Sequence, residues 1–474
     1  MNSGDFMKTQ MNTRHMLQIA LFLVIGAIAP LLDTTMTNVA LDTIMKSMAV
    51  SVNDVQWVTT SYVLALGIAV PIAGWATNWF DGKRIYLWAL IVFLIGSLVS
   101  SFSTTLPILI IGRIIQGAGA GIIVPLITTL VVQASGGTGL GKIMAVVGLP
   151  VVLIPILGPS IGGFLIDTLS WHWIFLVNVP LVIIAWVLLS WKLPAFPAPR
   201  TGKHLDFPSL ITLAGLFTSA IIGITRFSTG DHFFSAKVLT PILLAITFLI
   251  GYVVYASLRP KQALVSLKLF KSPTFDASAI ILMLSGIAVN GAMFLLPLYL
   301  QNSRGLTVIW SGAYLIAQGV GLLVARGEIG KLTDAIGARW VVLVAIVIAI
   351  AGTLPFVFFT AHTSTWLVLL ALFVRGIGQG GLTIPVMADS YTGVPKELVA
   401  EATTATRMLQ NIGGAVGTAI LATVIQHELP STGMNAAYQT AFMWSVGFIA
   451  ITAVPAWFLS HRKPVSISAS EKAE

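Results

Sequence analysis

The sequence predicts an all-α integral membrane protein in which two six-helix bundles are accompanied by two additional central helices. Three observations predict this class. The 474 residues are 56% hydrophobic and only 9% charged, whereas soluble domains carry about 25% charged residues. Apolar stretches of about 20 residues, the length that crosses a bilayer core, recur fourteen times. Parts of the sequence also repeat at an interval of about 260 residues.

The fourteen predicted spans follow one another along the whole chain. In order, they cover residues 17–41, 55–77, 84–103, 106–131, 140–167, 172–192, 207–227, 237–258, 276–301, 308–329, 339–360, 365–388, 397–426 and 438–460. With the N-terminus inside the cell, 18 of the 26 Lys and Arg residues fall in cytoplasmic loops and tails and four fall outside. Because cytoplasmic loops carry an excess of Lys and Arg, we expect a multi-pass protein of the inner or plasma membrane with both termini in the cytoplasm.

The repeat divides the chain into two related halves. The loop Gly74–Arg84 follows the second span, and the similar loop Gly330–Arg339 follows the tenth. Arg113 in the fourth span is likewise matched by Arg375 in the twelfth. We therefore expect one bundle at 1–192, two inserted helices with basic linkers at 193–271, a second bundle at 272–462 and a cytoplasmic tail at 463–474. Halves of this kind place substrate at the interface between them.

One carboxylate, Asp33, lies inside the first span, about 12 Å from its outer end. A carboxylate within the membrane is costly and marks a functional group with a nearby partner. Arg113 lies at a matching depth, about 10 Å, in the fourth span. Burial favours the protonated carboxyl group and a nearby cation favours the charged one, so we predict that Asp33 exchanges protons and Arg113 is its partner. A permanent structural ion pair or a helix cap is the alternative.

Five motifs occur in order along the chain. They are Asp33–Leu41, Gly74–Arg84, Arg113–Gly117, Gly158–Gly163 and Trp171–Pro180. Together they resemble the fourteen-helix drug:proton antiporter family of the major facilitator superfamily, and the resemblance covers nearly the whole chain. It implies the major facilitator fold, with proton-driven export of small amphipathic compounds.

The first loop departs from the family pattern, Gly-x-Leu-x-Asp-Arg-x-Gly-Arg-Lys, at Asn78, Trp79 and Asp81. The second loop keeps the pattern at Gly330, Leu332, Asp334, Gly337 and Arg339. We therefore expect the latch between loop and helix to depend more on the second half.

Several residues are predicted to act in the conformational change, because Pro loosens a membrane helix and Gly permits close helix approach. The Gly and Pro residues of the fifth span are joined in this set by residues of the two repeated loops and by two arginines of later spans. The full set is Gly74, Asn78, Lys83, Arg84, Gly158, Pro159, Gly162, Gly163, Gly330, Asp334, Gly337, Arg339, Arg375 and Arg407. Arg375 either bonds backbone carbonyls or attracts an anionic substrate group. Arg407 contacts Glu401, substrate or a structural network. Glu328 is a second candidate for proton binding.

The predicted substrate cavity combines apolar walls with a few polar groups, as suits amphipathic ligands. By the resemblance, its lining residues are Asn38, Tyr62, Gln116, Asn290, Phe294, Tyr299, Tyr314, Gln318, Met387, Gln410 and Asn411. So few buried acids favour monocationic or neutral lipophiles over dications. We expect protons, these small compounds and the lipid bilayer as partners, while a periplasmic adaptor is left open.

Other classes of function find little support. The chain has no cysteine, its basic residues are scattered rather than clustered as for nucleic acid, and we expect no metal or cofactor. Gly136-x-x-x-x-Gly141-Lys142 is followed by Ile143 where a P-loop needs Ser or Thr. The sequence contains no pattern of residues typical of a catalytic site, so it does not indicate an enzyme. The alternatives that stay open are an exporter dedicated to one metabolite or lipid and a membrane sensor that does not transport.

Overall fold

The computed structural model describes residues 13–135, 140–198, 205–228, 235–260, 262–390, 394 and 398–460. Thirteen helical stretches in this part of the chain are long and apolar enough to cross a membrane. The fifth predicted span is a further helix, whose described apolar part is Leu153–Thr168. The all-helical architecture with about fourteen spans is therefore confirmed.

The first half of the chain forms one group of helices. These are α1 (Thr13–Met48), α2 (Val52–Trp79), α3 (Gly82–Ser101), α4 (Leu106–Ser135), α5 (Leu140–Thr168), α6 (Trp173–Leu176) and α7 (Asn178–Lys192). The predicted sixth span is divided between α6 and α7. Pro180 explains the break, because it has no N–H to donate to Leu176 and its ring crowds that carbonyl.

The second half repeats this arrangement. It consists of η2 (Leu269–Lys271), α10 (Pro273–Asn302), α11 (Val308–Ile336), α12 (Ala338–Thr353), η3 (Leu354–Val357), α13 (Thr365–Asp389), α14 (Val399–Thr432), α15 (Met434–Ile451) and α16 (Ala453–Ala456). Gly337 alone joins α11 to α12, and its φ of 86° is a left-handed conformation that glycine adopts without strain. The two halves pack together mainly through α2 against α14 and α5 against α11.

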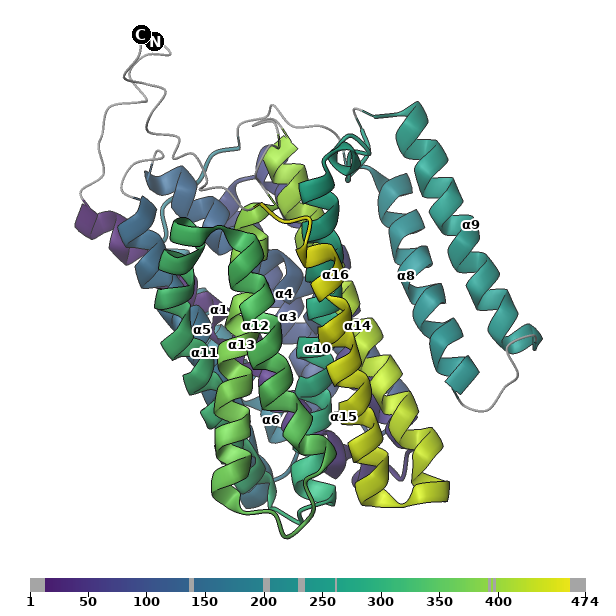
Figure 1. Ribbon diagram of the computed structural model, residues 1–474. Coiled ribbons are helices and arrows are strands. Elements are labelled where there is room, and N and C mark those ends of the chain that lie inside the picture. Colours follow the sequence, from purple (N-terminus) through teal and green to yellow (C-terminus); the bar gives the residue numbers. More distant parts are fainter. Residues whose placement is uncertain are drawn as a thin grey trace, which may run out of the picture.

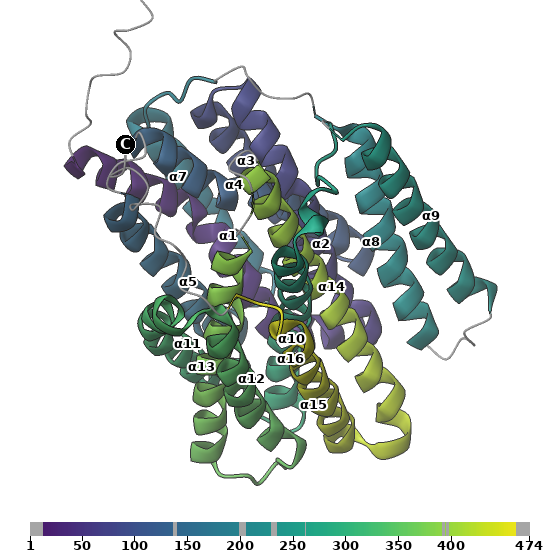
Figure 2. The ribbon, with the colours of Figure 1, turned by 45° about the horizontal axis from the view of Figure 1, so that its top comes forward.

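The helices α8 (Phe207–Ser228) and α9 (Ala236–Leu258) form a hairpin that stands beside the bundle (Figures 1 and 2). These two helices are central in the sequence but peripheral in space. Only α8 packs closely on the bundle, against α14 and α2. The Tyr252 hydroxyl fastens α9 to the next segment, because it donates to the carbonyl of Val265 at 2.8 Å and accepts its N–H at 3.0 Å.

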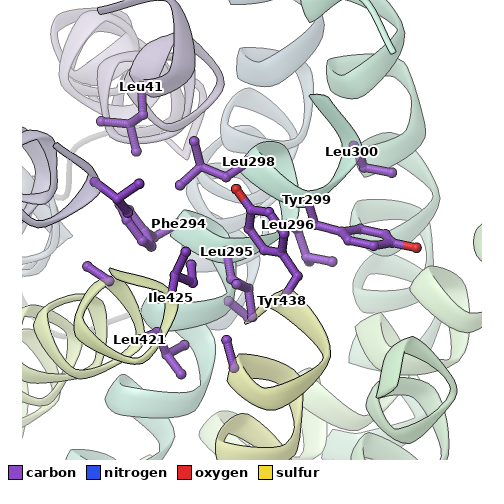
Figure 3. Packing of buried hydrophobic residues seen from close by; sticks show 14 of the residues in the cluster. Leu41, Phe294, Leu295, Leu296, Leu298, Tyr299, Leu300, Leu421, Ile425 and Tyr438 are labelled. Carbon is purple, nitrogen blue, oxygen red and sulfur yellow. The ribbon is translucent and has the colours of Figure 1, made fainter. Parts of the chain in front are cut away.

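A large hydrophobic cluster closes the bundle where α1 meets α2, which we call the α1–α2 end. It joins buried side chains of both halves, including Leu41, Phe294, Leu421 and Tyr438 (Figure 3). Gln301 of α10 also donates to the carbonyl of Val39 in α1, at 3.0 Å. The cluster and this hydrogen bond hold the halves together at the α1–α2 end. We call the opposite end, where α2 meets α3, the α2–α3 end.

Candidate functional site

The structure brings Asp33 and Arg113 together as an ion pair in the core of the first half. Their side chains are 0% and 1% exposed. Arg113 also donates to the Val58 carbonyl at 3.0 Å and to Gln116 Oε1 at 2.9 Å. Its guanidinium lies 4.1 Å from the ring centre of Tyr62, a cation–π contact. The charge pair is therefore fully removed from solvent and its cation has several partners.

Two amide side chains complete the shell of donors around Asp33. Gln116 Nε2 donates to Asp33 Oδ1 at 3.3 Å, and Asn178 Nδ2 donates to the same oxygen at 3.1 Å. Gln116 is held in place by Ser97, whose hydroxyl accepts from Nε2 at 2.9 Å. Charge-assisted hydrogen bonds of this kind stabilise the ionised carboxylate. The sequence-predicted Tyr62 and Gln116 thus belong to this cluster, while Asn178 and Ser97 were missed.

A cavity of about 210 Å³ lies between the two halves. Its lining residues come from α1, α5, α10, α11 and α13: Thr35, Asn38, Pro155, Ile156, Pro159, Met293, Leu296, Leu315, Gln318, Gly319, Leu322 and Gln379. Among the sequence-predicted lining residues, Asn38 and Gln318 are part of this wall. Gln379 of α13 was missed, because only Arg375 and Met387 of this helix were considered.

The remaining predicted lining residues lie elsewhere in the described part of the chain. Phe294 and Tyr299 are fully buried in the cluster that closes the α1–α2 end. The Tyr314 hydroxyl lies 2.9 Å from Thr365 Oγ1, and Met387 is half-buried in α13. The others lie where α14 packs on its neighbours: Asn290 against Gly414, the Gln410 carbonyl against Gly286, and Asn411 against Gly67. Their contact with substrate stays a prediction.

Arg375 is the counterpart of Arg113 in the second half, but its surroundings differ. It is 3% exposed, and Nη2 donates to the carbonyl of Ala288 at 3.1 Å. The Nε and Nη1 atoms are buried with no hydrogen-bond partner among the described residues. No described carboxylate forms an ion pair with it. This geometry fits the backbone-carbonyl alternative. Among the described residues, a buried Asp–Arg pair is found in the first half alone.

The Gly-Pro cluster of α5 lies on its packing surfaces. Gly158 and Gly162 face Thr35 and Met36 of α1. Gly163 faces the backbone of Ile309 at the start of α11 in the other half, closely enough that no larger residue would fit without displacement.

The same contact between the halves is continued by Pro159, whose carbonyl lies against Gly312 of α11. Nearby, the Asp167 carboxylate of α5 accepts the N–H of Ile309 at 3.1 Å. It binds one of the free donors of the α11 N-terminus. Sequence reasoning missed Asp167.

The two repeated loops hold different partners. Asp81, which replaces a family glycine, caps α3 by accepting the N–H of Arg84 at 3.1 Å and also accepts the N–H of Phe196 at 2.8 Å. In the second half, Arg339 donates through Nε to the Leu459 carbonyl at 3.3 Å. Each loop thus fastens the chain that leaves the last helix of its half.

The remaining predicted residues of these loops, and those of α14, lie in different surroundings. The Cβ positions of Gly74 and Gly330 face open space. Lys83 and Arg84 belong to the first turn of α3, and Arg84 is exposed. The side chains of Asn78, Asp334 and Glu401 lie outside the described residues. Arg407 is exposed on α14.

Glu328 is paired with Lys331 at 2.8 Å, and both side chains are more than 60% exposed. A carboxylate so exposed loses little hydration, so Glu328 lacks the burial that distinguishes Asp33. Within the described residues, no group of three or more His, Asp or Glu side chains could hold a metal ion.

Comparisons with known proteins agree with this architecture. The family model for the Major Facilitator Superfamily matches residues 23–418. The Multidrug resistance protein B homolog of Mycobacterium tuberculosis is 28% identical over 407 residues, which cover 85% of this chain and 75% of that protein. The Lincomycin resistance protein LmrB of Listeria innocua is 31% identical over 424 residues, covering 89% and 88%.

Solved transporters share the fold. The crystal structure of a D-xylose-proton symporter superposes with a TM-score of 0.69 at 14% sequence identity, covering 95% of this chain and 99% of that one. The nucleoside transporter NupG superposes with a TM-score of 0.65, also at 14% identity, covering 94% and 98%. The family match, these folds and the many apolar helices indicate a multi-pass membrane transporter rather than an enzyme. This chain belongs to the major facilitator superfamily.

Proposed function

We propose that the protein exports hydrophobic or amphipathic compounds, such as drugs, across the cytoplasmic membrane in exchange for protons. The observation that carries the proposal is the Asp33–Arg113 pair, fully buried inside a helix bundle. The relatives that are described as multidrug and lincomycin resistance proteins support the class of substrate. The scattered basic loops support a cytoplasmic position for both termini and for the α2–α3 end.

The buried pair offers a direct way to couple protonation to conformation. Protonation of Asp33 neutralises the carboxylate and leaves Arg113 as a buried cation without its counter-charge. Such an uncompensated charge costs several kcal/mol. The protonated protein therefore favours a conformation in which Arg113 reaches water or another partner. The proposed result is a change in which end of the bundle is open: the α1–α2 end, which would face the exterior, or the α2–α3 end.

The cavity between the halves supports alternating access, because its walls belong to both bundles. Division of the chain at 192/193 and 271/272, with the α8–α9 hairpin as an insertion, is part of this proposal. The packing of α8 on α14 and α2 supports an accessory position for the hairpin.

Transport in proteoliposomes tests the proposal. Export of a lipophilic dye under an imposed proton gradient should be lost in Asp33→Asn, while dye exchange without a gradient persists and shows that the variant is folded. Asp54→Asn is the matched control, since Asp54 is an exposed acid in the first turn of α2. Full gradient-driven transport by Asp33→Asn would remove Asp33 from the mechanism. Transport of a single metabolite and of no dye would favour the dedicated exporter.

A further inference from the structure

The free polar groups of the cavity are concentrated on the wall formed by the second half. Gln318 of α11 donates through Nε2 to Oε1 of Gln379 in α13, at 2.9 Å. Both side chains line the cavity. The two amides therefore present a joined polar surface from neighbouring helices.

Each amide keeps one unused hydrogen-bonding group. Gln318 is only 9% exposed, and its Oε1 is buried without a partner among the described residues. The Nε2 of Gln379 likewise makes no hydrogen bond within the described part of the chain. If the oxygen and nitrogen positions of both amides were exchanged, Gln379 would donate to Gln318 instead. One donor and one acceptor would again be left without a partner. A buried unpaired acceptor is unfavourable, so a ligand that pairs with it gains affinity.

The wall of the first half has no comparable free groups. Asn38 Nδ2 donates to the Thr34 carbonyl at 3.1 Å, and its Oδ1 accepts from Thr59 at 3.2 Å. The Thr35 hydroxyl donates to the carbonyl of Leu32 at 3.1 Å. These polar groups are satisfied within their own half, so the polar part of a ligand should bind to Gln318 and Gln379.

Charge on a ligand would find no counter-charge in this cavity. None of the described residues that line it is ionisable. Asp33 and Arg113 are paired with each other and shielded from solvent. A cation that enters would lose hydration without forming an ion pair, which is strongly unfavourable. Apolar side chains such as Met293, Leu296 and Leu322 form much of the remaining wall.

We infer that Gln318 and Gln379 recognise an uncharged amphiphile whose polar group both donates and accepts a hydrogen bond, as an amide or alcohol does. This inference rests on the proposed export function and specifies its substrate class. It also assigns recognition of the polar group to the second half, whereas the buried charge pair belongs to the first.

Equilibrium binding to the purified full-length protein tests the inference separately from transport. The probes are radiolabelled chloramphenicol, which is neutral and carries an amide and hydroxyl groups, and ethidium, a cation. Wild type should bind chloramphenicol more tightly than ethidium. Gln318→Met and Gln379→Met keep side-chain size but remove the amide, and each should weaken chloramphenicol binding about tenfold.

Two further variants sharpen the comparison. Gln439→Met is the matched control, because Gln439 donates to the Phe359 carbonyl outside the cavity, and its affinity for chloramphenicol should equal that of wild type. Gln318→Glu places an acid in the cavity and should raise ethidium affinity at least tenfold.

The possible results separate the inference from the proposed function. Unchanged chloramphenicol affinity in both cavity variants, tighter binding of ethidium than of chloramphenicol to wild type, or no chloramphenicol binding would overturn the inference. Proton-driven dye export would still support the proposed function in each of these cases. Conversely, specific chloramphenicol binding by a protein that moves nothing under a proton gradient would refute the proposed function and keep the assignment of the site.

Discussion

A single methyl group added at Gly163 should open the protein at its α1–α2 end. In Gly163→Ala, the new Cβ would lie 2.6 Å from Cα of Ile309 and 2.8 Å from the carbonyl oxygen of Val308. Ordinary van der Waals contact begins at 3.4 Å, so α5 and α11 must separate by about 0.8 Å. Backbone atoms cannot rotate away from the clash as a flexible side chain can.

The clash acts only while the two halves are in contact at this end. Overpacking of this kind costs about 1–3 kcal/mol, which changes the ratio of open to closed molecules by roughly 5- to 150-fold. The variant should therefore populate the conformation open at the α1–α2 end much more than wild type does.

Cysteine accessibility measures this shift directly. The chain has no cysteine, so Leu41→Cys supplies one reactive thiol. Leu41 is fully buried in the cluster that closes the α1–α2 end (Figure 3). Modification of this thiol by a membrane-impermeant maleimide should be roughly 5- to 150-fold faster when Gly163→Ala is added. Gly447→Ala is the matched control, because a Cβ there meets nothing within 4 Å. Equal rates in the two glycine variants would refute the reasoning.

Two further predictions concern stability and pH. Arg113→Met should lower the free energy of unfolding by about 3–5 kcal/mol, because Asp33 is left as an unpaired buried charge. Adding Asp33→Asn should recover part of this loss, whereas additive losses in a denaturant titration followed by tryptophan fluorescence would contradict the coupling. Burial lowers the pKa of His172, against the smaller opposite effect of its hydrogen bond to the Ser103 backbone. The folded protein then binds this proton less readily than the unfolded chain, so stability should fall as the pH drops below about 6.5. Thermal unfolding between pH 7.5 and 5.5 should show a smaller decrease in His172→Gln, and an identical decrease would show that another group is responsible.

The spans and the central ion pair could be predicted from sequence because the bilayer imposes strict rules. A helix must satisfy its own backbone and needs about 20 apolar residues, which defines the segments. A carboxylate such as Asp33 needs a partner at its own depth. Arg113 is a suitable cation in the first half, and depth along the membrane follows from counting residues.

Rotation of each helix about its axis was much harder to predict. Most spans are apolar on all sides, so sequence does not show which face meets a neighbour. Gln116 was therefore placed in the substrate cavity, whereas it donates to Asp33. Asn178 was given no role, although it shares that carboxylate. Phe294 and Tyr299 lie in the closed cluster, and their environment depends on which end of the transporter is closed.

The construction of the cavity from both halves has a kinetic consequence. Thr35 and Gln318 line opposite walls of the cavity, so a ligand would contact both only while the walls are close together. When the halves separate at either end, part of these contacts is lost. Under the proposed alternating access, substrate would thus be held most tightly midway through the cycle, and that binding energy would lower the barrier between the two open states. A well-matched compound accelerates its own passage, while a tightly bound compound that contacts one wall alone would slow the cycle.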